Sequence, residues 1–260
     1  MPIVSERSSM TWTGDGPGGG PPLSVSEVGE EKVRQDSSRA KTFGKRKVAA
    51  GPVRGYVKLS DATKAFGFDF RGKTVLDIGS STGGFTQYAL NHGAKRVIAI
   101  EKGTNQMEHP LRDDPRIELH EKTDIFDVKT QATHRRTSRS SVAQNPTPKS
   151  KVICTPDVIL ADVSFLSLTK ILKYAKIHIS RSDTDFLVML KPQFEAIPAQ
   201  LHDGVVKNET IRRGIIKNFE QWLKQNGFII VKKRDNDLKG KTGNKERFYW
   251  LRPSISTAKH

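Results

Sequence analysis

Cysteine and long apolar runs are nearly absent from this 260-residue sequence, and their absence excludes several classes of protein. The single cysteine, Cys154, excludes a disulfide framework and any zinc site built from several cysteines. No run approaches the roughly 18 apolar residues of a membrane span, and residues 1–10 lack the apolar stretch of a signal peptide. We therefore expect a soluble cytoplasmic protein that does not bind membranes.

Acidic residues are few relative to basic ones. The 28 Asp and Glu residues face 44 Lys and Arg, which gives a formal net charge of +16. Because Lys and Arg displace condensed counterions from phosphates, this surplus favours a nucleic acid as partner. Charge alone fits a merely soluble basic surface equally well.

The two ends of the chain lack the apolar periodicity of a folded domain. Residues 1–50 hold seven Gly and four Pro, and such a segment cannot bury enough apolar surface to offset its chain entropy. We predict a disordered, Gly- and Pro-rich basic tail over residues 1–50 and a C-terminal tail over residues 254–260.

Between residues 52 and 253, apolar runs typical of strands alternate with segments typical of helices. Strands of continuous apolar residues separated by helices indicate an α/β domain with a mostly parallel sheet and helices on both faces. The last two strands have no helix between them, which predicts an antiparallel edge. The expected strands are 74–79, 96–101, 116–120, 157–162, 185–190, 228–232 and 247–251, and the expected helices are 84–91, 104–111, 166–179 and 209–226.

A basic segment at residues 129–151 interrupts this order. It contains six Lys and Arg and no acid, and it lacks apolar periodicity. A structureless segment longer than about 15 residues is uncommon in a compact domain. We predict a flexible insertion, which is either a tolerated surface loop or a segment that binds a phosphate backbone.

The sharpest local signal lies between the first strand and the first helix of this domain, in the run Asp77-Ile78-Gly79-Ser80-Ser81-Thr82-Gly83-Gly84-Phe85. Glycines let the backbone turn tightly and approach a ligand in front of a helix N-terminus. The run lacks the G-x-G-x-x-G spacing of a dinucleotide site, so NAD or FAD is a poor match. It fits the D-x-G-x-x-x-G-G loop of methyltransferases that use S-adenosylmethionine (SAM).

Two further acids follow the next two strands. Glu101 ends the second strand, where an acid can accept both hydroxyls of a ribose. Asp124 follows the third strand, where it could meet the exocyclic amine of adenine. We therefore expect SAM as cofactor, bound by Asp77, Gly79, Ser81, Thr82, Gly83, Gly84, Phe85, Glu101 and Asp124.

The sequence also bears on the methyl acceptor. Amino-directed base methyltransferases carry an Asn/Asp-Pro-Pro-aromatic run after the fourth strand, where this chain reads Asp162-Val163-Ser164-Phe165. Pyrimidine C5 methylation needs a cysteine nucleophile, and Cys154 has no His or acid nearby in sequence; we expect it to be a structural residue. A ribose hydroxyl is a different problem, because it needs a base or cations that stabilise the forming alkoxide. Methylation of a small molecule or protein is a further reading, which the positive charge of the chain disfavours.

Four residues at strand or helix edges suit that chemistry, namely Lys58, Asp162, Lys191 and Glu246. The carboxyl ends of the middle strands of a parallel sheet converge on the ligand crevice, so Asp162 and Lys191 should meet there. Lysines can serve as base or as stabilising cation. Each lysine taken alone is more simply explained as a solvated surface charge; the two at the ends of apolar strands, beside rigid Pro or Gly turns, are less easily explained in that way.

Residues 53–252 resemble the TlyA-type members of the FtsJ-like rRNA 2′-O-methyltransferases, many of which carry the name hemolysin. The runs Lys191-Pro192-Gln193-Phe194-Glu195 and Ser81-Thr82-Gly83-Gly84-Phe85-Thr86 are the most specific. The other runs that carry the resemblance are 54–59, the remainder of 76–86, 111–116, 162–168, 203–206 and 243–246.

The resemblance implies a Rossmann-like methyltransferase fold with a catalytic tetrad on Lys58, Asp162, Lys191 and Glu246. Lys191 would be the central lysine at the 2′-hydroxyl, and Asp162 would steer its charge and border the SAM site. Lys58 and Glu246 would orient the ribose. Ribosomal RNA or a ribosomal subunit would be the partner, and no metal is implied.

The chain departs from the family pattern in three places. Residues 1–50 show no small RNA-binding domain of the kind with which family members usually begin. The sequence at 196–202 replaces a glycine-rich stretch, and Glu101 stands where Asp is commoner. The alternative function is a catalytically silent RNA-binding, ribosome-associated or hemolysin-like protein that retains the fold.

Overall fold

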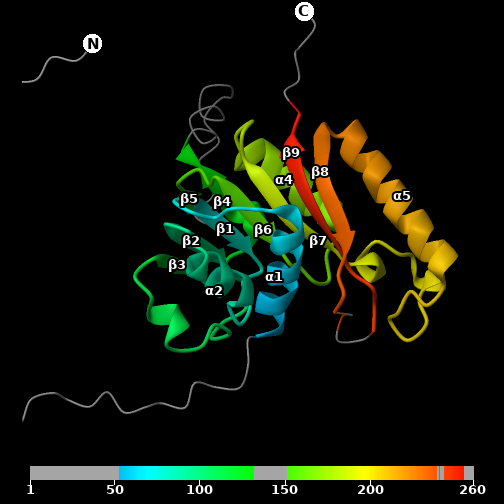
Figure 1. The fold of residues 1–260 in the computed structure, drawn as a ribbon, viewed down its shortest axis with the longest axis horizontal. Coiled ribbons are helices and arrows are strands. Elements are labelled where there is room, and N and C mark those ends of the chain that lie inside the picture. The colour runs from blue at the N-terminus through cyan, green and yellow to red at the C-terminus, as the bar shows by residue number, and fades with distance from the viewer. Residues whose placement is uncertain (1–52, 132–150, 239, 241–242, 255–260) are drawn as a thin grey trace, which may run out of the picture. The chain divides into compact units, whose positions relative to one another are not determined.

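The structure is a computed structural model that describes residues 53–131, 151–238, 240 and 243–254 (Figure 1). The predicted N-terminal tail, the C-terminal tail beyond Ser254 and residues 132–150 of the basic insertion lie outside the described residues. Strands of the main sheet are β1 Thr74–Ile78, β2 Arg96–Ile100, β3 Ile117–His120, β6 Val158–Ala161, β7 Asp185–Leu190, β8 Phe228–Asp235 and β9 Arg247–Pro253. The helices are α1 Arg54–Phe66, α2 Gly84–Asn91, α4 Leu168–His178 and α5 Glu209–Gln225.

The seven strands form one sheet in the order β3-β2-β1-β6-β7-β9-β8. The five strands from β3 to β7 pair in parallel, whereas β9 pairs antiparallel with both β7 and β8. This architecture confirms the predicted mostly parallel α/β fold and its antiparallel edge. The sheet thus ends in the antiparallel pair of β8 and β9.

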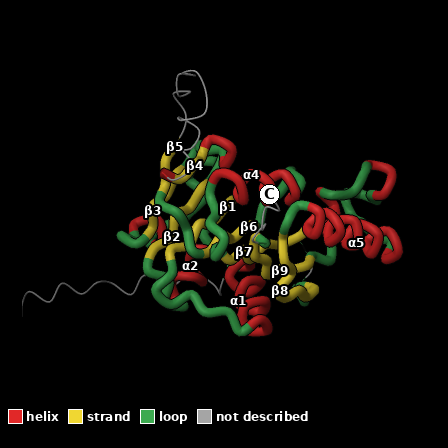
Figure 2. Tube along the Cα trace, turned by 90° about the horizontal axis from the view of Figure 1, so that it is seen from above, coloured by secondary structure: helices red, strands yellow, loops and turns green. Residues whose placement is uncertain are grey.

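Helices cover both faces of the sheet (Figure 2). Because successive strand residues point to opposite faces, each central strand supplies both cores. Leu76 and Ile78 of β1 pack in the cluster that holds α4 and α5, whereas Val75 packs in the cluster that holds α1 and α2. Burial on both faces explains why the strands read as continuous apolar runs.

The strand order reverses direction at β1, which has β2 on one side and β6 on the other. Ligands of open α/β sheets bind at such a switch point, outside the carboxyl ends of the strands. Strand β9 runs antiparallel to β7, so its first residue lies at that same edge of the sheet. The topology therefore gathers the ends of β1, β2, β6 and β7 and the start of β9.

Two helical segments differ from the sequence prediction. We assigned no element to residues 54–66, which form α1 and end at Gly67 in the left-handed conformation (φ 64°). The helix expected at 104–111 is wrong: turns occupy the segment and only the 3₁₀ turn Leu111–Asp113 follows. Asn105 has a positive φ, and the residue before Pro110 is disfavoured in a helix.

The ends of the basic insertion pair with each other. Strands β4 (Val128–Thr130) and β5 (Lys151–Ile153) form a separate two-stranded parallel sheet. Residues expected to belong wholly to a flexible loop are therefore ordered at both ends. Of the helices in the described ranges, none combines the length and apolar character that a membrane span requires.

Helices α1 and α2 approach closely where each begins. A Cβ atom added at Gly84 would lie 2.8 Å from the backbone nitrogen of Tyr56 and 3.1 Å from the Cα of Gly55. Backbone atoms cannot give way as a flexible side chain can, so Gly84 is required by helix packing. This contact fixes α1 against the loop that precedes α2.

We predict that Gly84→Ala lowers the free energy of unfolding by about 1–3 kcal/mol, because the added methyl group forces the two helices apart. Denaturant unfolding monitored by circular dichroism measures the change. Gly214→Ala in α5 is the matched control, since a Cβ there meets nothing within 4 Å. Removing a glycine from a helix should stabilise the control by about 0.5–1 kcal/mol. Equal stabilities of the two variants would contradict the packing argument.

A carboxyl group is buried at the centre of the sheet. Asp77 of β1 is 1% exposed, and its Oδ2 accepts a hydrogen bond of 2.7 Å from the Thr86 hydroxyl of α2. Burial raises the pKa of Asp77 to about 7, the Thr86 hydrogen bond opposes this rise, and the charges of Asp162 and Glu101 add to it. The folded state therefore binds a proton that the unfolded state has already released above about pH 4.

We predict that this proton makes stability fall as pH rises. The folded-state pKa of Asp77 is raised, so its contribution is fully present below about pH 4 and is lost as pH passes about 7. Relative to Asp77→Asn, which cannot titrate, the wild type should lose on the order of a few kcal/mol of unfolding free energy between pH 5 and 8. Urea unfolding of both proteins across this range measures the difference. If the unfolding free energies of the two proteins change in parallel over this pH range, Asp77 is already ionised in the folded state and the prediction is wrong.

Candidate active site

Two adjoining cavities open at the carboxyl edge of the sheet. The larger, of about 770 Å³, contains Lys58 and Lys191, and we call it the lysine cavity. The smaller, of about 600 Å³, contains Glu101 and Asp124, and we call it the acid cavity. Both volumes are in the range of small-molecule sites. The wall between them is formed by residues that line both, which are Gly79, Ser81, Asp162, Ser164 and Phe165.

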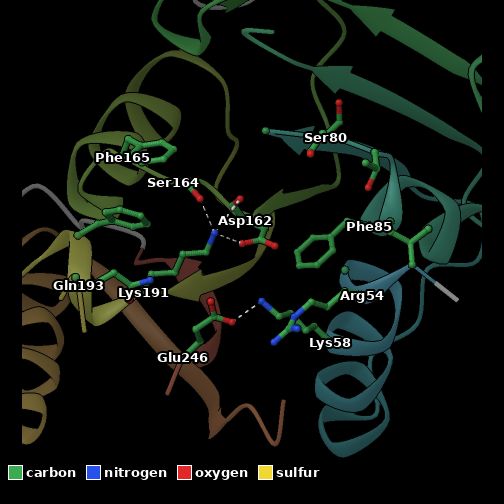
Figure 3. Close-up of a pocket in the computed structure, with 18 residues that line it drawn as sticks. Arg54, Lys58, Ser80, Phe85, Asp162, Ser164, Phe165, Lys191, Gln193 and Glu246 are labelled. Atoms are coloured by element: carbon green, nitrogen blue, oxygen red, sulfur yellow. Dashed lines mark hydrogen bonds and ion pairs between the residues drawn. The ribbon is translucent and has the colours of Figure 1, made fainter. Parts of the chain in front are cut away.

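A lysine–aspartate ion pair stands at this wall. Lys191 follows β7 and Asp162 follows the neighbouring β6, so the parallel pairing of these strands brings them together. Lys191 Nζ lies 2.6 Å from Asp162 Oδ1 and donates to Ser164 Oγ at 2.9 Å (Figure 3). The Lys191 side chain is only 10% exposed, so the ammonium is fixed in direction and largely shielded from water.

A second ion pair lies deeper in the lysine cavity. Lys58 of α1 donates to Glu246, which directly precedes β9, over 2.5 Å from Nζ to Oε2. The two residues are 5% and 2% exposed. A Cβ at Gly240 would lie 2.9 Å from Glu246 Oε1, so the backbone packs against the carboxylate. Removing two charges from water is costly, and only close pairing offsets that cost.

The structure thus brings the four predicted catalytic residues into one cavity. They come from α1, from the ends of β6 and β7, and from the start of β9, and they form two cation–carboxylate pairs (Figure 3). Lys58 and Lys191 are each balanced by an acid, and Arg54 adds a further positive charge to the lining of the cavity. Such a site can hold a neutral hydroxyl group and stabilise negative charge that develops on its oxygen.

The glycine-rich loop after β1 crosses the front of both cavities. Gly79, Ser81 and Gly83 all have positive φ angles, of 78°, 48° and 86°. Gly83 is the N-cap of α2, and a Cβ there would overlap the Leu111 side chain. Of the loop residues predicted to bind the cofactor, those that line the lysine cavity are Gly79, Ser81, Thr82, Gly84 and Phe85.

Two of the predicted cofactor residues line neither cavity. Asp77 is buried beneath the loop, where it ties β1 to Thr86 of α2, and Gly83 provides the turn into α2. Both residues therefore support the loop from behind. Gly84 also packs α2 against α1, as described above.

The acid cavity has a polar end and an apolar side. Glu101, 9% exposed, accepts hydrogen bonds from the backbone nitrogens of Ser81 (2.8 Å) and Gly103 (2.7 Å). Asp124 forms an ion pair with Lys102 at 3.1 Å and also accepts from the Phe126 nitrogen. Apolar lining is provided by Ile78, Ile100, Ile125, Phe126, Val163, Leu166 and Ile171.

This donor set suits a nucleoside with a charged tail. An acid beside an apolar pocket at the end of β2 matches a ribose with its base, and the positive end of α2 behind the loop favours a carboxylate. Ser80 and Gln193 border the lysine cavity, and their buried atoms Ser80 Oγ and Gln193 Oε1 have no hydrogen-bond partner within the described residues. Buried polar atoms normally have a hydrogen-bond partner, so a bound ligand that supplies one would be favoured at these two atoms. The residues present therefore fit SAM.

Sequence reasoning missed one exposed aromatic at the cavity mouths. Phe165 is 91% exposed, has a positive φ of 65°, and its ring centroid lies 5.5 Å from that of Phe194. It lines both cavities. A strained and exposed phenylalanine is unusual. It lies in a run that carries the family resemblance, which was the only available signal.

The expectation for Cys154 is wrong. It is exposed and does not pack in the core, because it lies in the loop between β5 and β6. In the part of the chain that the structure describes, no group of three or more His, Cys, Asp or Glu side chains is arranged to hold a metal ion.

Comparisons with known proteins agree with this geometry. Residues 52–253 match the family described as FtsJ-like methyltransferase. The protein named 16S/23S rRNA (cytidine-2'-O)-methyltransferase TlyA of Mycobacterium tuberculosis is 31% identical over 239 residues, which are 92% of this chain and 78% of that protein. Hemolysin A of Brachyspira hyodysenteriae is 34% identical over 191 residues, which are 73% of this chain and 71% of that protein.

A solved structure from Lactococcus lactis that carries the hemolysin name superposes with a TM-score of 0.65 at 32% identity, covering 77% of this chain and 87% of that one. The family match spans the helices, the sheet and both cavities described above. The chain therefore belongs to the FtsJ-like methyltransferase family.

Proposed function

We propose that this protein uses SAM to methylate a ribose 2′-hydroxyl of ribosomal RNA, with Lys58, Asp162, Lys191 and Glu246 as its catalytic tetrad. The observation that carries the proposal is the pair of shielded lysine–carboxylate contacts in a cavity that adjoins the acid cavity. Such cations suit a hydroxyl acceptor, because they stabilise the negative charge that develops on its oxygen as the proton leaves.

The acid cavity would hold the adenosine part of the cofactor. Glu101 would accept from the ribose and Asp124 from the adenine amine, while Ile100 and Ile125 would contact the flat base. The loop from Gly79 to Phe85 would lead the methionine part toward the wall that the two cavities share. When bound, SAM supplies a methyl group on a positively charged sulfur, which keeps the bonding electron pair as the acceptor oxygen attacks.

Lys191 would act on the acceptor. Its ammonium points toward Asp162 and Ser164 at the shared wall, so an entering 2′-hydroxyl can replace the Ser164 contact. The lysine then holds the oxygen in line for transfer and stabilises the negative charge that develops on it. The hydroxyl proton passes to the Asp162 carboxylate, since the Lys191 ammonium has no free position for it, and from there to solvent.

Lys58 and Glu246 would hold the ribose from the opposite side. The 2.5 Å contact locks both side chains, so a sugar hydroxyl meets a fixed donor and a fixed acceptor. Phe165 would stack on the base of the acceptor nucleotide, since an exposed ring binds any base through its face.

Ribosomal RNA is proposed as the substrate on two grounds. The relative from Mycobacterium tuberculosis is named for methylation of rRNA at a cytidine 2′-oxygen. The formal charge of +16 suits a phosphate backbone. Ribosomal RNA in turn implies a cytoplasmic location.

Methyl transfer from labelled SAM to ribosomal RNA tests the proposal. After nuclease digestion, the label should be found on a 2′-O-methylated nucleoside, and Lys191→Ala should reduce turnover about 10²–10⁴-fold because the alkoxide loses its cation. The affinity for S-adenosylhomocysteine (SAH), measured by calorimetry, should change little. Lys170→Met, which removes an exposed lysine of α4, is the matched control and should stay active.

Three results would refute the proposal or part of it. Label on a base or on protein would exclude ribose methylation. RNA binding without any transfer would favour the non-enzymatic alternative. An active Lys191→Ala variant would remove Lys191 from the mechanism while leaving the reaction itself in place.

The buried Lys58–Glu246 pair yields a prediction that separates stability from catalysis. Lys58→Met or Glu246→Leu alone leaves one buried charge unpaired and should cost about 3–5 kcal/mol of unfolding free energy. The double variant removes both charges and should recover most of that loss, yet it should remain inactive because no donor and acceptor are left for the ribose. Urea unfolding and the label assay, run on all four proteins, measure the two effects. A double variant that is both stable and active would exclude the pair from catalysis.

A further inference from the structure

Gln106 lies in the acid cavity, within the segment 104–111 for which we predicted a helix but no functional residue. It belongs to the irregular segment after β2 and lines the cavity beside Glu101. Its side-chain amide bridges two elements of the site: the Ser81 hydroxyl donates to Gln106 Oε1 at 3.0 Å, and Gln106 Nε2 donates to Glu101 Oε1 at 3.3 Å. Gln106 therefore cross-links the glycine-rich loop to the acid.

The hydrogen bonds at Glu101 limit what this acid can bind. An ionised carboxylate offers about four acceptor positions. The backbone nitrogens of Gly103 and Ser81 use two of them, and the Gln106 amide uses a third. One position is left, although a ribose presents two neighbouring hydroxyls. Glu101 in this arrangement cannot accept from both, as an acid at this place was expected to do.

We propose that Gln106 is a cofactor-binding residue that shares the ribose with Glu101, each taking one of the two hydroxyls. This inference rests on the proposed function, because it takes the ligand of the acid cavity to be SAM. The Gln106 nitrogen carries two hydrogens, and the contact with Glu101 uses one. The other hydrogen can donate to the ribose oxygen that the carboxylate cannot serve.

The surrounding residues hold the amide in place. A Cβ atom at Gly103 would overlap the Gln106 amide and would lie 3.2 Å from Glu101 Oε1, so a side chain at this position would displace the bridge. Because the Glu101 carboxylate accepts from the Ser81 and Gly103 nitrogens and from the Gln106 amide, ribose recognition becomes a property of both side chains.

Calorimetry of the full-length protein with SAH and with its 2′-deoxy and 3′-deoxy analogues tests this division. The wild type should bind each deoxy analogue about tenfold more weakly than SAH, since each lacks one hydrogen bond to a polar or charged group. Gln106→Leu should bind SAH about tenfold more weakly and should lose its sensitivity to one of the two hydroxyls. Glu101→Gln should keep its sensitivity to that hydroxyl, because Gln106 is intact.

Two further variants sharpen the test. Gly103→Ala leaves both polar side chains in the chain but displaces the amide, so it should reproduce the Gln106→Leu pattern. Gln221→Leu removes an exposed glutamine of α5 and should match the wild type with all three ligands.

A Gln106→Leu variant that keeps full sensitivity to both hydroxyls would overturn the inference while leaving the proposed function intact. Failure of the wild type to bind SAH at all would instead overturn the proposed function, and the inference with it.

Discussion

The buried contact between Lys58 and Glu246 is the constraint on which the rest of the site depends. It joins the first described helix to the last strand, with both side chains almost completely removed from water. Two charges in that position are tolerated only when they meet at close range. Helix α1 must therefore lie against the edge of the sheet where β9 begins, and every element that fixes α1 or β9 also serves the site.

The packing around this pair shows how it is maintained. Gly84 allows α1 and α2 to touch through their backbones, and the Phe85 ring stacks on Phe248 of β9 at 6.0 Å between centroids. The antiparallel pairing of β9 with β7 then brings Glu246 to the edge at which Lys191 leaves the sheet. The two lysine–carboxylate pairs consequently share one cavity although their residues are far apart in sequence.

Electrostatics divides the work between the two cavities. In the lysine cavity Lys58 and Lys191 each pair with an acid, an arrangement that would suit the neutral hydroxyl acceptor of the proposed function. The acid cavity concentrates carboxylates around a polar end, and two backbone nitrogens and the Gln106 amide occupy three of the acceptor positions of Glu101. Asp77, buried beneath the loop between them, has its pKa raised to about 7 by burial, so near neutral pH it need not add a full negative charge to this region.

The local pattern of apolar and polar residues was sufficient to predict the strands of the sheet and to select the candidate site residues. Continuous apolar runs predicted the strands because both faces of the sheet are buried, and the end of each run marked the place where a polar side chain reaches the crevice. Lys191, Asp162 and Glu101 were found in this way. Helix α1 was missed, and the helix expected at 104–111 does not form, because short segments with mixed patterns are decided by packing and by residues such as Asn105 and Pro110.

The sequence by itself determined the α/β class, the glycine-rich loop and the identity of the four polar residues at element ends, since these follow from periodicity and residue chemistry. Only the tertiary structure decided which of them meet. The pairing of Lys58 with Glu246, the three donors around Glu101 and the exposure of Phe165 depend on contacts between segments distant in sequence. Such contacts arise from strand order and helix packing, which no local run of residues encodes.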